Sequence, residues 1–508
     1  MPSPRRAVDA VIWAFAISGF AAYVWLACQR LGYPLELDFI EGVMVDHIAR
    51  LAHGQPIYVE PTLRFIPLAY MPFFSLVASW VTHATGIGFF APRLVSFVST
   101  LLTAGLLAGI VWRETRRRTL AAAAVGVYAS AFAITGACYD VARPDSLMLL
   151  LTFTGLAVLR YTRGVRGSLV AALLLTFGFF TKQHSVLFSF GALGYLFFHE
   201  RRRFVPFAVA LVAGCGGGYL LLDRWLGDWF RVFTWSIPRG WSTINRARIE
   251  HYVGEGVLGS LACSTVPALL SLGVHDPDAE PGRALWYWTG LAAFGTGMLA
   301  TLDPSAYLHV FTPTVLALCI LGPIALDRIG RGLDATTGGK AGRGQTLVMV
   351  VLAAQFLPLA YSVGRERPRP HAADVHAALI DRLRGLGTGA MVPYHGWYST
   401  EAGGPSSLQF IALDDIQRSR GNAILKHDPG YLDRMFAPLA SGPGRPAILF
   451  DYRLEHSGHL WQMIEPGYRL ADSIPQPMRG TLVPITGNQH SITYVYVPVD
   501  PAVTDTVK

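Results

Sequence analysis

The residues "RRAVDAVIWAFAISGFAAYVWLACQRLGYPLELDFIEG" (Arg5 to Gly42) decide the class of protein. Two arginines precede an apolar run at about 9–29, which matches the roughly 20 residues that a transmembrane helix needs. The run resembles a signal peptide, but it is too long and has no small-residue cleavage site. We therefore expect an N-terminal membrane anchor that leads directly into the acidic residues Asp38 and Glu41.

Similar apolar runs recur as far as about residue 362. Of the 508 residues, 52% are hydrophobic and only 15% are charged, a composition that belongs in a bilayer. A simple count gives twelve apolar runs, at about 9–29, 67–84, 89–112, 119–137, 145–161, 167–181, 185–199, 204–222, 252–273, 284–301, 306–325 and 345–362. The sequence therefore predicts an α-helical polytopic membrane protein.

The run at 67–84 is the exception, because it contains Pro67 and Pro72 and ends with Trp80 and His83. If it is a juxtamembrane or re-entrant helix, eleven spans remain and the short basic loops all fall on the cytoplasmic side, where positive charge is favoured. These basic clusters lie at Arg5/Arg6, Arg113 to Arg118, Arg163/Arg166, Arg201 to Arg203 and Arg328 to Arg343. An odd number of spans puts the N-terminus in the cytoplasm and the C-terminus outside.

Residues 363–508 have a different pattern from the transmembrane domain predicted for residues 1–362. Strand-like runs "GAMVPY", "PAILFDY" and "ITYVYVPV" alternate with helix-like stretches such as "AADVHAALIDRL" and with Gly and Pro breaks. We expect a small periplasmic α/β domain there, in a protein of the bacterial inner membrane.

The charge pattern argues against a nucleic-acid-binding protein, and the cysteines argue against a disulfide-stabilised or metal-binding protein. The net charge of +8 comes from arginine clusters between apolar runs, which is typical of topology signals and not of a nucleic-acid partner. The five cysteines fall in or beside apolar segments with no paired spacing, so no disulfide framework or metal site is implied.

The first outer loop contains an acidic pair, Asp38 and Glu41, at the point where an amphipathic helix begins. Spaced by three residues, the two carboxylates share one helical face if the helix has started. One of them could act as a general base, with its pKa raised by the other. Alternatively, both could simply stabilise the N-terminus of the helix.

The next two outer loops are short and carry further charges at the membrane surface. Asp140, Arg143 and Asp145 crowd the mouth of one span, where Asp145 could equally cap the helix after Pro144. In "FFTKQHSV", Lys182 and His184 form a candidate phosphate-binding corner, although a lysine can also reach the interface without binding a ligand.

A longer outer segment between Asp223 and Glu250 contains five arginines, among them Arg239, and four tryptophans. Arginine outside breaks the positive-inside rule and favours lipid phosphate. Interfacial anchoring by the tryptophans, without any substrate, is the alternative.

The motifs "GQPIY" (54–58), "AYMPF" (69–73), "RPDSLMLLL" (143–151) and "TKQ" (181–183) follow the acidic pair in an order that resembles the polytopic GT-C glycosyltransferases. That class includes the protein O-mannosyltransferases and the transferase that adds aminoarabinose to lipid A. The resemblance covers roughly residues 30–325. It implies an inverting transfer from a polyprenyl-phosphate sugar to a glycan, lipid or protein acceptor.

The resemblance also implies roles for individual residues. The catalytic base falls on Asp38 or Glu41, because the adjacent Asp-Glu of the relatives is Asp-Phe-Ile-Glu here, and the second acidic position falls on Asp140 or Asp145. Substrate contacts are expected from Tyr58, Arg64, Tyr70, Arg143, Lys182, His184 and Arg239. Some relatives need a divalent metal, so Mg or Mn is a candidate cofactor at the carboxylates, but no metal site is assigned.

Two other functions share this architecture. A transporter or flippase also places charges at membrane depth, but it is typically built from repeated halves, and no repeat is present. A non-catalytic subunit of a surface-polysaccharide pathway would not need the acidic pair of the first outer loop.

Overall fold

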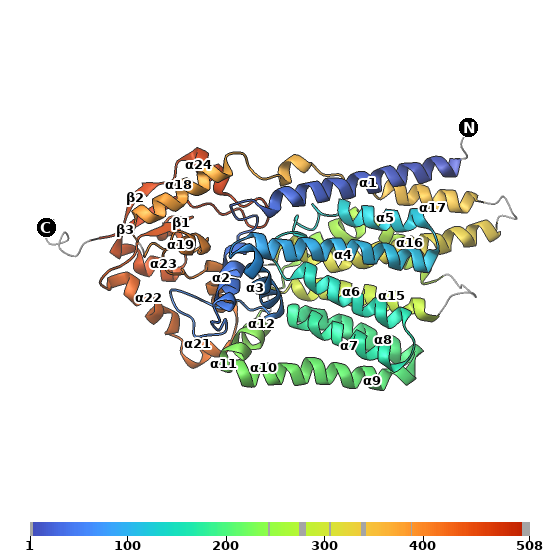
Figure 1. Ribbon diagram of the computed structural model, residues 1–508, viewed down its shortest axis with the longest axis horizontal. Coiled ribbons are helices and arrows are strands. Elements are labelled where there is room, and N and C mark those ends of the chain that lie inside the picture. The colour runs from blue at the N-terminus through green and yellow to red at the C-terminus, as the bar shows by residue number, and fades with distance from the viewer. Residues whose placement is uncertain are drawn as a thin grey trace.

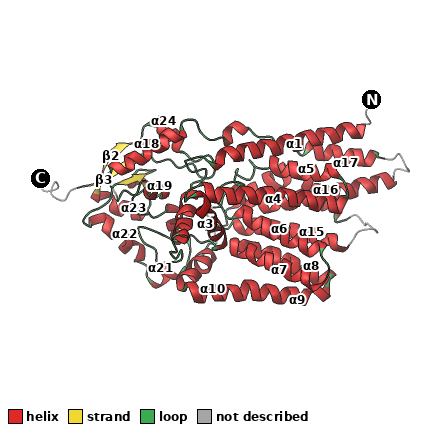
Figure 2. Ribbon diagram, viewed as in Figure 1, coloured by secondary structure: helices red, strands yellow, loops and turns green. Residues whose placement is uncertain are grey.

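The computed structural model describes residues 4–241, 244–273, 281–303, 306–336, 342–387 and 389–499. Roughly parallel helices form an elongated bundle at one end, and the C-terminal part of the chain covers the other end (Figure 1). The start of α1 and the C-terminal strands therefore lie at opposite ends of the molecule. Helices dominate throughout, and the few strands lie in the C-terminal part (Figure 2).

The bundle helices coincide with the apolar runs. They are α1 (Pro4–Leu31), α4 (Phe90–Thr115), α5 (Arg118–Ser130), α6 (Asp145–Tyr161), α7 (Gly164–Thr181), α8 (Val186–His199), α9 (Arg201–Leu211), α10 (Gly218–Leu226), α14 (Ala262–Ser271), α15 (Ala284–Ala300), α16 (Thr312–Thr336) and α17 (Arg343–Ala354). A helix satisfies its own backbone hydrogen bonds, which is why apolar runs adopt it in a bilayer.

Burial separates the bundle core from its surface. The apolar window within 308–335 is 94% buried, and α16 contacts α4, α5, α14, α15 and α17. In contrast, the window within 201–226 is 11% buried, and its Leu221 and Trp225 are exposed, as lipid-facing side chains would be. Small residues allow close approach inside the bundle, because a Cβ on Gly126 of α5 would lie 2.5 Å from the Ala16 Cα of α1.

Among the described residues, five helices are long and apolar enough to cross a membrane on their own. A sixth is added if 246–260 and 262–271, which meet at an 86° bend, form one span. Each of the eleven predicted ranges contains helical residues, but the count of eleven and the topology stay predictions.

The first outer segment consists of α2 (Glu41–Ala52), an irregular stretch and α3 (Phe73–Thr85), and it lies where the bundle meets the C-terminal part (Figure 1). The 13 residues of α3 extend about 20 Å, less than the roughly 30 Å of a hydrocarbon core. Because α5 is equally short, length alone does not separate α3 from the spans, and the interpretation of the run at 67–84 as a juxtamembrane helix stays a prediction.

The C-terminal part combines short helices with one antiparallel sheet. Strands β1 (Ile448–Phe450), β2 (Tyr468–Ser473) and β3 (Tyr494–Pro498) pair in the order β1-β3-β2. Two of the expected strands are β1 and β3, whereas "GAMVPY" contributes only an isolated bridge from Met391 to Ile448. The sequence did not indicate β2, because five of its six residues are exposed and it has no apolar alternation.

The helices of this part are α18 (Ala372–Gly385), α19 (Trp397–Glu401), α20 (Phe410–Arg418), α21 (Ala423–His427), α22 (Tyr431–Ser441), α23 (His459–Ile464) and α24 (Gln476–Leu482). The helix expected from "AADVHAALIDRL" is α18. Residues 500–508 of the predicted domain lie outside the described residues, and the boundary at 362/363 stays a prediction.

A continuous hydrophobic core joins the first outer segment to the C-terminal part. Ile40 and Val43 pack in one cluster with Ile416 and Ile448. Backbone hydrogen bonds reinforce the contact, from the Leu408 amide to the Leu63 carbonyl at 2.9 Å and from the Thr486 amide to the Leu37 carbonyl at 2.8 Å. The first outer loop is therefore fixed between the helix bundle and the C-terminal part of the chain.

Candidate active site

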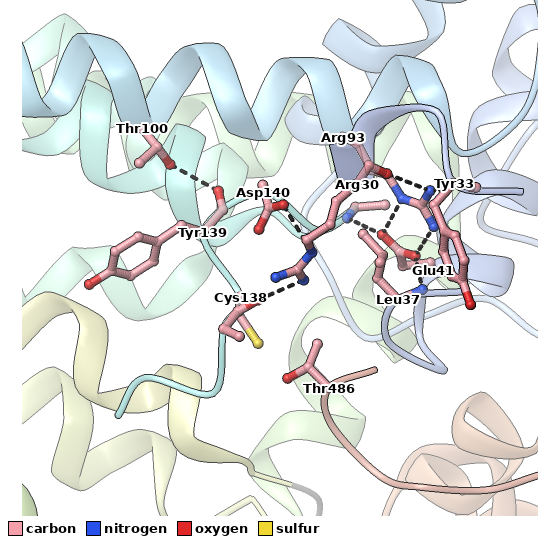
Figure 3. Close-up of polar contacts among 12 residues, drawn as sticks. Arg30, Tyr33, Leu37, Glu41, Arg93, Thr100, Cys138, Tyr139, Asp140 and Thr486 are labelled. Carbon is pink, nitrogen blue, oxygen red and sulfur yellow. Dashed lines mark hydrogen bonds and ion pairs between the residues drawn. The ribbon is translucent and has the colours of Figure 1, made fainter. Parts of the chain in front are cut away.

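Glu41 is held by Arg93 of α4 at the outer end of the bundle (Figure 3). The guanidinium donates to both carboxylate oxygens, at 3.0 Å from Nε and 2.6 Å from Nη2. The amides of Leu37 and Ala142 donate to the same carboxylate at 2.7 and 2.8 Å. Each Glu41 oxygen thus accepts two hydrogen bonds, and the side chain is fully buried.

Arg93 also fixes the chain that leaves α1. It donates to the carbonyls of Arg30, Tyr33 and Leu35 at 2.6 to 3.2 Å. The Arg93–Glu41 pair therefore ties three parts of the outer surface together, namely the end of α1, the start of α2 and the loop before α6. Such a pair is a positioning element.

Asp140 belongs to a second buried pair, with Arg30 at the end of α1 (Figure 3). The Arg30 Nε lies 3.1 Å from the Asp140 Oδ2, and Arg30 Nη2 donates to the Ala137 carbonyl at 2.9 Å. Burial raises the pKa of Asp140, and the Arg30 charge opposes that shift. The pair holds the second outer loop against α1.

Asp38 pairs with Arg143, the third buried ion pair of this region. Arg143 Nη1 lies 2.7 Å from the Asp38 Oδ2, while the other oxygen accepts only the Ile40 amide at 3.2 Å. Burial raises the pKa of Asp38, and the neighbouring arginine opposes the rise. Unlike Glu41, Asp38 keeps acceptor capacity for another hydrogen bond.

Asp145, the first residue of α6, accepts a 2.7 Å hydrogen bond from Lys182 at the end of α7. The lysine ammonium also lies 5.8 Å from the centre of the Tyr70 ring. Asp145 is therefore a first-turn residue of α6 with no side-chain capping bond, and its carboxylate pairs with Lys182 instead.

A small cavity of about 30 Å³, here called the central cavity, lies beside these pairs. Its polar lining is Tyr70, Arg143, Lys182, Gln183, His184, Trp241, Asp303, His309 and Asp415, and Ile40 and Ile411 are among its apolar residues. Three of its buried nitrogens, Arg143 Nε, His184 Nδ1 and His309 Nδ1, have no hydrogen-bond partner among the described residues. Buried polar atoms without partners are uncommon, and a polar ligand would satisfy them.

The other predicted substrate contacts lie elsewhere. Tyr58 is buried and donates to the Tyr70 carbonyl at 2.6 Å, so it supports the cavity wall from behind. Arg64 and Arg239 are exposed and do not line the central cavity. Their substrate contacts stay predictions.

A further cluster connects the first outer loop to the C-terminal part. His395 is hydrogen-bonded to Glu36 through Nδ1 and lies 3.2 Å from Asp451 through Nε2, with all three buried. Burial alone would lower the pKa of His395, but the two carboxylates raise it to about 10. The sequence alone does not single out His395, because His371, His376 and His395 are scattered along the chain.

Among the described residues, no group of three or more His, Cys, Asp or Glu side chains is arranged to hold a metal ion. Asp38, Glu41 and Asp140, the proposed Mg or Mn ligands, are each paired with a different arginine. A requirement for Mg or Mn stays a prediction.

Residues 67–216, from α3 to α9, match the family model described as dolichyl-phosphate-mannose-protein mannosyltransferase. Among solved structures, ArnT from Cupriavidus metallidurans bound to undecaprenyl phosphate is similar over 96% of this chain and 98% of its own, with a TM-score of 0.59 at 12% identity. The chain has the GT-C glycosyltransferase fold.

A second GT-C protein supports this assignment. The archaeal oligosaccharyltransferase AglB from Archaeoglobus fulgidus, in complex with an inhibitory peptide and a dolichol-phosphate, is similar over 91% of this chain and 70% of its own, with a TM-score of 0.51 at 10% identity. No curated protein sequence matches the chain. The predicted resemblance to the GT-C class is confirmed, and with it the multi-pass membrane architecture.

Residues that were not among the predicted site residues complete the candidate site. Arg93 interrupts an apolar run near the start of its helix, a costly arrangement that could have flagged it. Asp415 and Trp241 reach the central cavity from segments far away in the sequence. No spacing rule predicts such contacts.

Proposed function

We propose that this chain transfers a sugar from a polyprenyl-phosphate donor to an acceptor hydroxyl on the extracytoplasmic face of the bacterial inner membrane. The observation that carries the proposal is the central cavity, where Arg143 and Lys182 lie beside two buried histidine nitrogens that have no partner. It occurs in a GT-C fold similar to that of ArnT bound to undecaprenyl phosphate.

The donor phosphate is assigned to the cationic wall of the central cavity. Lys182 uses one bond to Asp145 and has further N–H donors, and Arg143 Nε is free to donate. Charge-assisted hydrogen bonds to phosphate are strong in a buried site. These groups would bind the donor and stabilise the negative charge that develops as the phosphate leaves.

Asp38 is assigned as the general base in preference to Glu41. Both are buried, but the Glu41 oxygens already accept four hydrogen bonds, two of them from the Arg93 guanidinium. A carboxylate held in that way has no lone pair left for an acceptor hydroxyl. Asp38 accepts one N–H bond on each oxygen, from the Ile40 amide at 3.2 Å and from Arg143 at 2.7 Å, and a long contact from the Cys138 thiol at 4.0 Å. Arg143 in turn lines the donor cavity.

The reaction is then a single displacement. Asp38 removes the proton of the acceptor hydroxyl while the acceptor oxygen attacks the anomeric carbon of the donor sugar. The bond from that carbon to the phosphate oxygen breaks, and its electron pair leaves with the lipid phosphate. Attack opposite the leaving group inverts the anomeric centre.

The test is turnover of polyprenyl-phosphate sugars by the purified protein in nanodiscs, with a membrane-glycan extract as acceptor. Release of undecaprenyl phosphate by the wild type, and its loss in the Asp38→Asn variant, is the expected result. Asp381→Asn, an exposed carboxylate change on α18, is the matched control.

If the protein were a transporter or flippase, we would expect transport of the lipid-linked sugar and no release of undecaprenyl phosphate. Such a protein would move the lipid-linked sugar across a liposome bilayer and leave the bond between sugar and phosphate intact. A non-catalytic subunit would do neither. Transport without release would therefore contradict the proposed function.

A further inference from the structure

A second cavity lies between the first outer segment and the C-terminal part. Its rings are Phe39, Tyr394, Phe410, Tyr452 and His490, so it is here called the aromatic cavity. Its polar residues include Arg248, Asp414, Arg418 and Asn488. With a volume of about 450 Å³, it falls in the range of about 300 to 1,000 Å³ that is usual for ligand pockets.

The rings form one connected wall. Tyr394 stacks on Phe410 with centroids 4.2 Å apart and contacts the Tyr452 ring at 5.7 Å. His490 contacts Tyr394 at 5.0 Å and Phe39 at 5.5 Å. Because the Tyr452 hydroxyl lies 2.7 Å from His490 Nδ1, the wall is held in place by polar as well as apolar contacts.

The aromatic cavity is lined by residues that neighbour Asp38 and Gly487 in the chain. Phe39 follows Asp38 directly, and Asn488 follows Gly487, whose backbone lies against the Asp38 carboxylate. A Cβ on Gly487 would lie 2.8 Å from Asp38 Oδ1, and the residue has a φ of +74°, so only glycine fits comfortably there. Ile411 lines both cavities, so the two cavities share a wall residue.

We propose that the aromatic cavity is the acceptor site and that it binds a carbohydrate. This inference rests on the proposed function and specifies its acceptor. Sugars present C–H faces that stack on aromatic rings, and their adjacent hydroxyls pair with planar side chains such as Asn, Asp and Arg. The cavity offers both kinds of contact beside the assigned base.

The charges of the cavity favour an uncharged sugar at this position. Arg418 Nε lies 2.8 Å from Asp414 Oδ1, so these two charges neutralise each other. Arg248 donates to the carbonyls of Thr301 and Asp303. In contrast, the central cavity presents unpaired nitrogens, as expected of a phosphate site. The two cavities therefore differ in the way that an acceptor sugar and a donor phosphate require.

The experiment measures binding of the full chain in nanodiscs to immobilised mannan, arabinan, galactan and rhamnan fragments and to lipopolysaccharide core oligosaccharide, with serine- and threonine-containing peptides alongside. Tyr452→Ala removes a ring that is 45% exposed, so the buried core stays intact. Leu470→Ala, on β2 and 42% exposed, is the control outside both cavities. Binding of undecaprenyl phosphate is measured on the same samples.

We expect the wild type and Leu470→Ala to bind at least one saccharide, and Tyr452→Ala to bind it about tenfold more weakly, the effect of losing roughly one stacking contact. All three should bind undecaprenyl phosphate equally. Binding of undecaprenyl phosphate without any saccharide, preference for a peptide, or unchanged saccharide affinity in Tyr452→Ala would overturn this inference and leave the proposed function standing. Saccharide binding without undecaprenyl phosphate binding would instead contradict the proposed function.

Discussion

The Arg143 guanidinium donates to the Asp38 carboxylate at 2.7 Å, and the same arginine lines the cavity that contains Lys182. One residue thus touches both the assigned base and the assigned phosphate site. This shared contact would fix the position of the base relative to the leaving phosphate, because a shift of Arg143 would move both groups. The predictions below separate the roles of the residues around it.

Asp38→Asn should lower turnover about 10²- to 10⁴-fold, the usual contribution of a general base. It should destabilise the protein less than Glu41→Gln does, because Asp38 accepts one bond from Arg143 whereas Glu41 accepts two from Arg93. Asparagine has nearly the same shape and can still accept the Arg143 hydrogen bond. The measurement is release of undecaprenyl phosphate at saturating donor, with the melting temperature of each sample. Wild-type turnover in Asp38→Asn would show that the base lies elsewhere.

Glu41→Gln should act on stability first. It leaves the buried Arg93 guanidinium without its charged partner, a change that costs about 3 to 5 kcal/mol when a buried pair is broken. We expect a lower melting temperature by scanning fluorimetry and a poor yield of folded protein. Arg93→Gln combined with Glu41→Gln removes both charges and should recover part of the loss. Unchanged stability in Glu41→Gln would contradict the positioning role.

Lys182→Met should weaken binding of undecaprenyl phosphate about 10- to 100-fold, because one charge-assisted hydrogen bond to phosphate is lost from a buried site. Lys426→Met, an exposed lysine on α21, is the control. The affinity can be measured by native mass spectrometry in nanodiscs. Equal affinities in the two variants would remove Lys182 from the phosphate site.

The pH dependence of turnover should report on Asp38. Burial raises the pKa of this carboxyl above its usual 3.8, and a base must be ionised, so activity should fall as the pH drops through the raised value. Removing the opposing charge in Arg143→Gln should raise the pKa further and move the acidic limb of kcat/KM to higher pH. A shift to lower pH, or none, would contradict the assignment.

The Glu36–His395–Asp451 cluster should make stability depend on pH. The folded-state pKa of His395, about 10, exceeds the ordinary 6.5, so the stabilisation is complete below pH 6.5 and is lost as the pH rises through about 10. The difference in melting temperature between wild type and His395→Gln should therefore be largest at low pH and shrink towards pH 10. A difference that grows with pH would exclude this explanation.

Some of the site could be predicted from the sequence, because its charges interrupt apolar runs. Asp38, Arg143, Asp145 and Lys182 stand out in this way, and the structure brings them to one end of the bundle. Their partners could not be assigned, since an ion pair such as Arg93–Glu41 joins residues 52 positions apart. The apolar runs themselves predicted the bundle helices well.

The C-terminal part was harder to predict. An exposed strand such as β2 has no apolar alternation, and the rings of the aromatic cavity come from segments between residues 39 and 490 that only the folded chain brings together. Contacts between the first outer loop and this part, such as Glu36 with His395, follow from tertiary packing and not from local pattern.

The central claim is that Asp38 acts as the base while the central cavity binds the lipid phosphate. It is tested most directly by measuring donor binding and donor turnover in one variant. We predict that Asp38→Asn binds undecaprenyl phosphate with wild-type affinity and releases it from a polyprenyl-phosphate sugar at least about 100 times more slowly than the wild type. Loss of binding together with turnover, or turnover at the wild-type rate, would contradict the central claim.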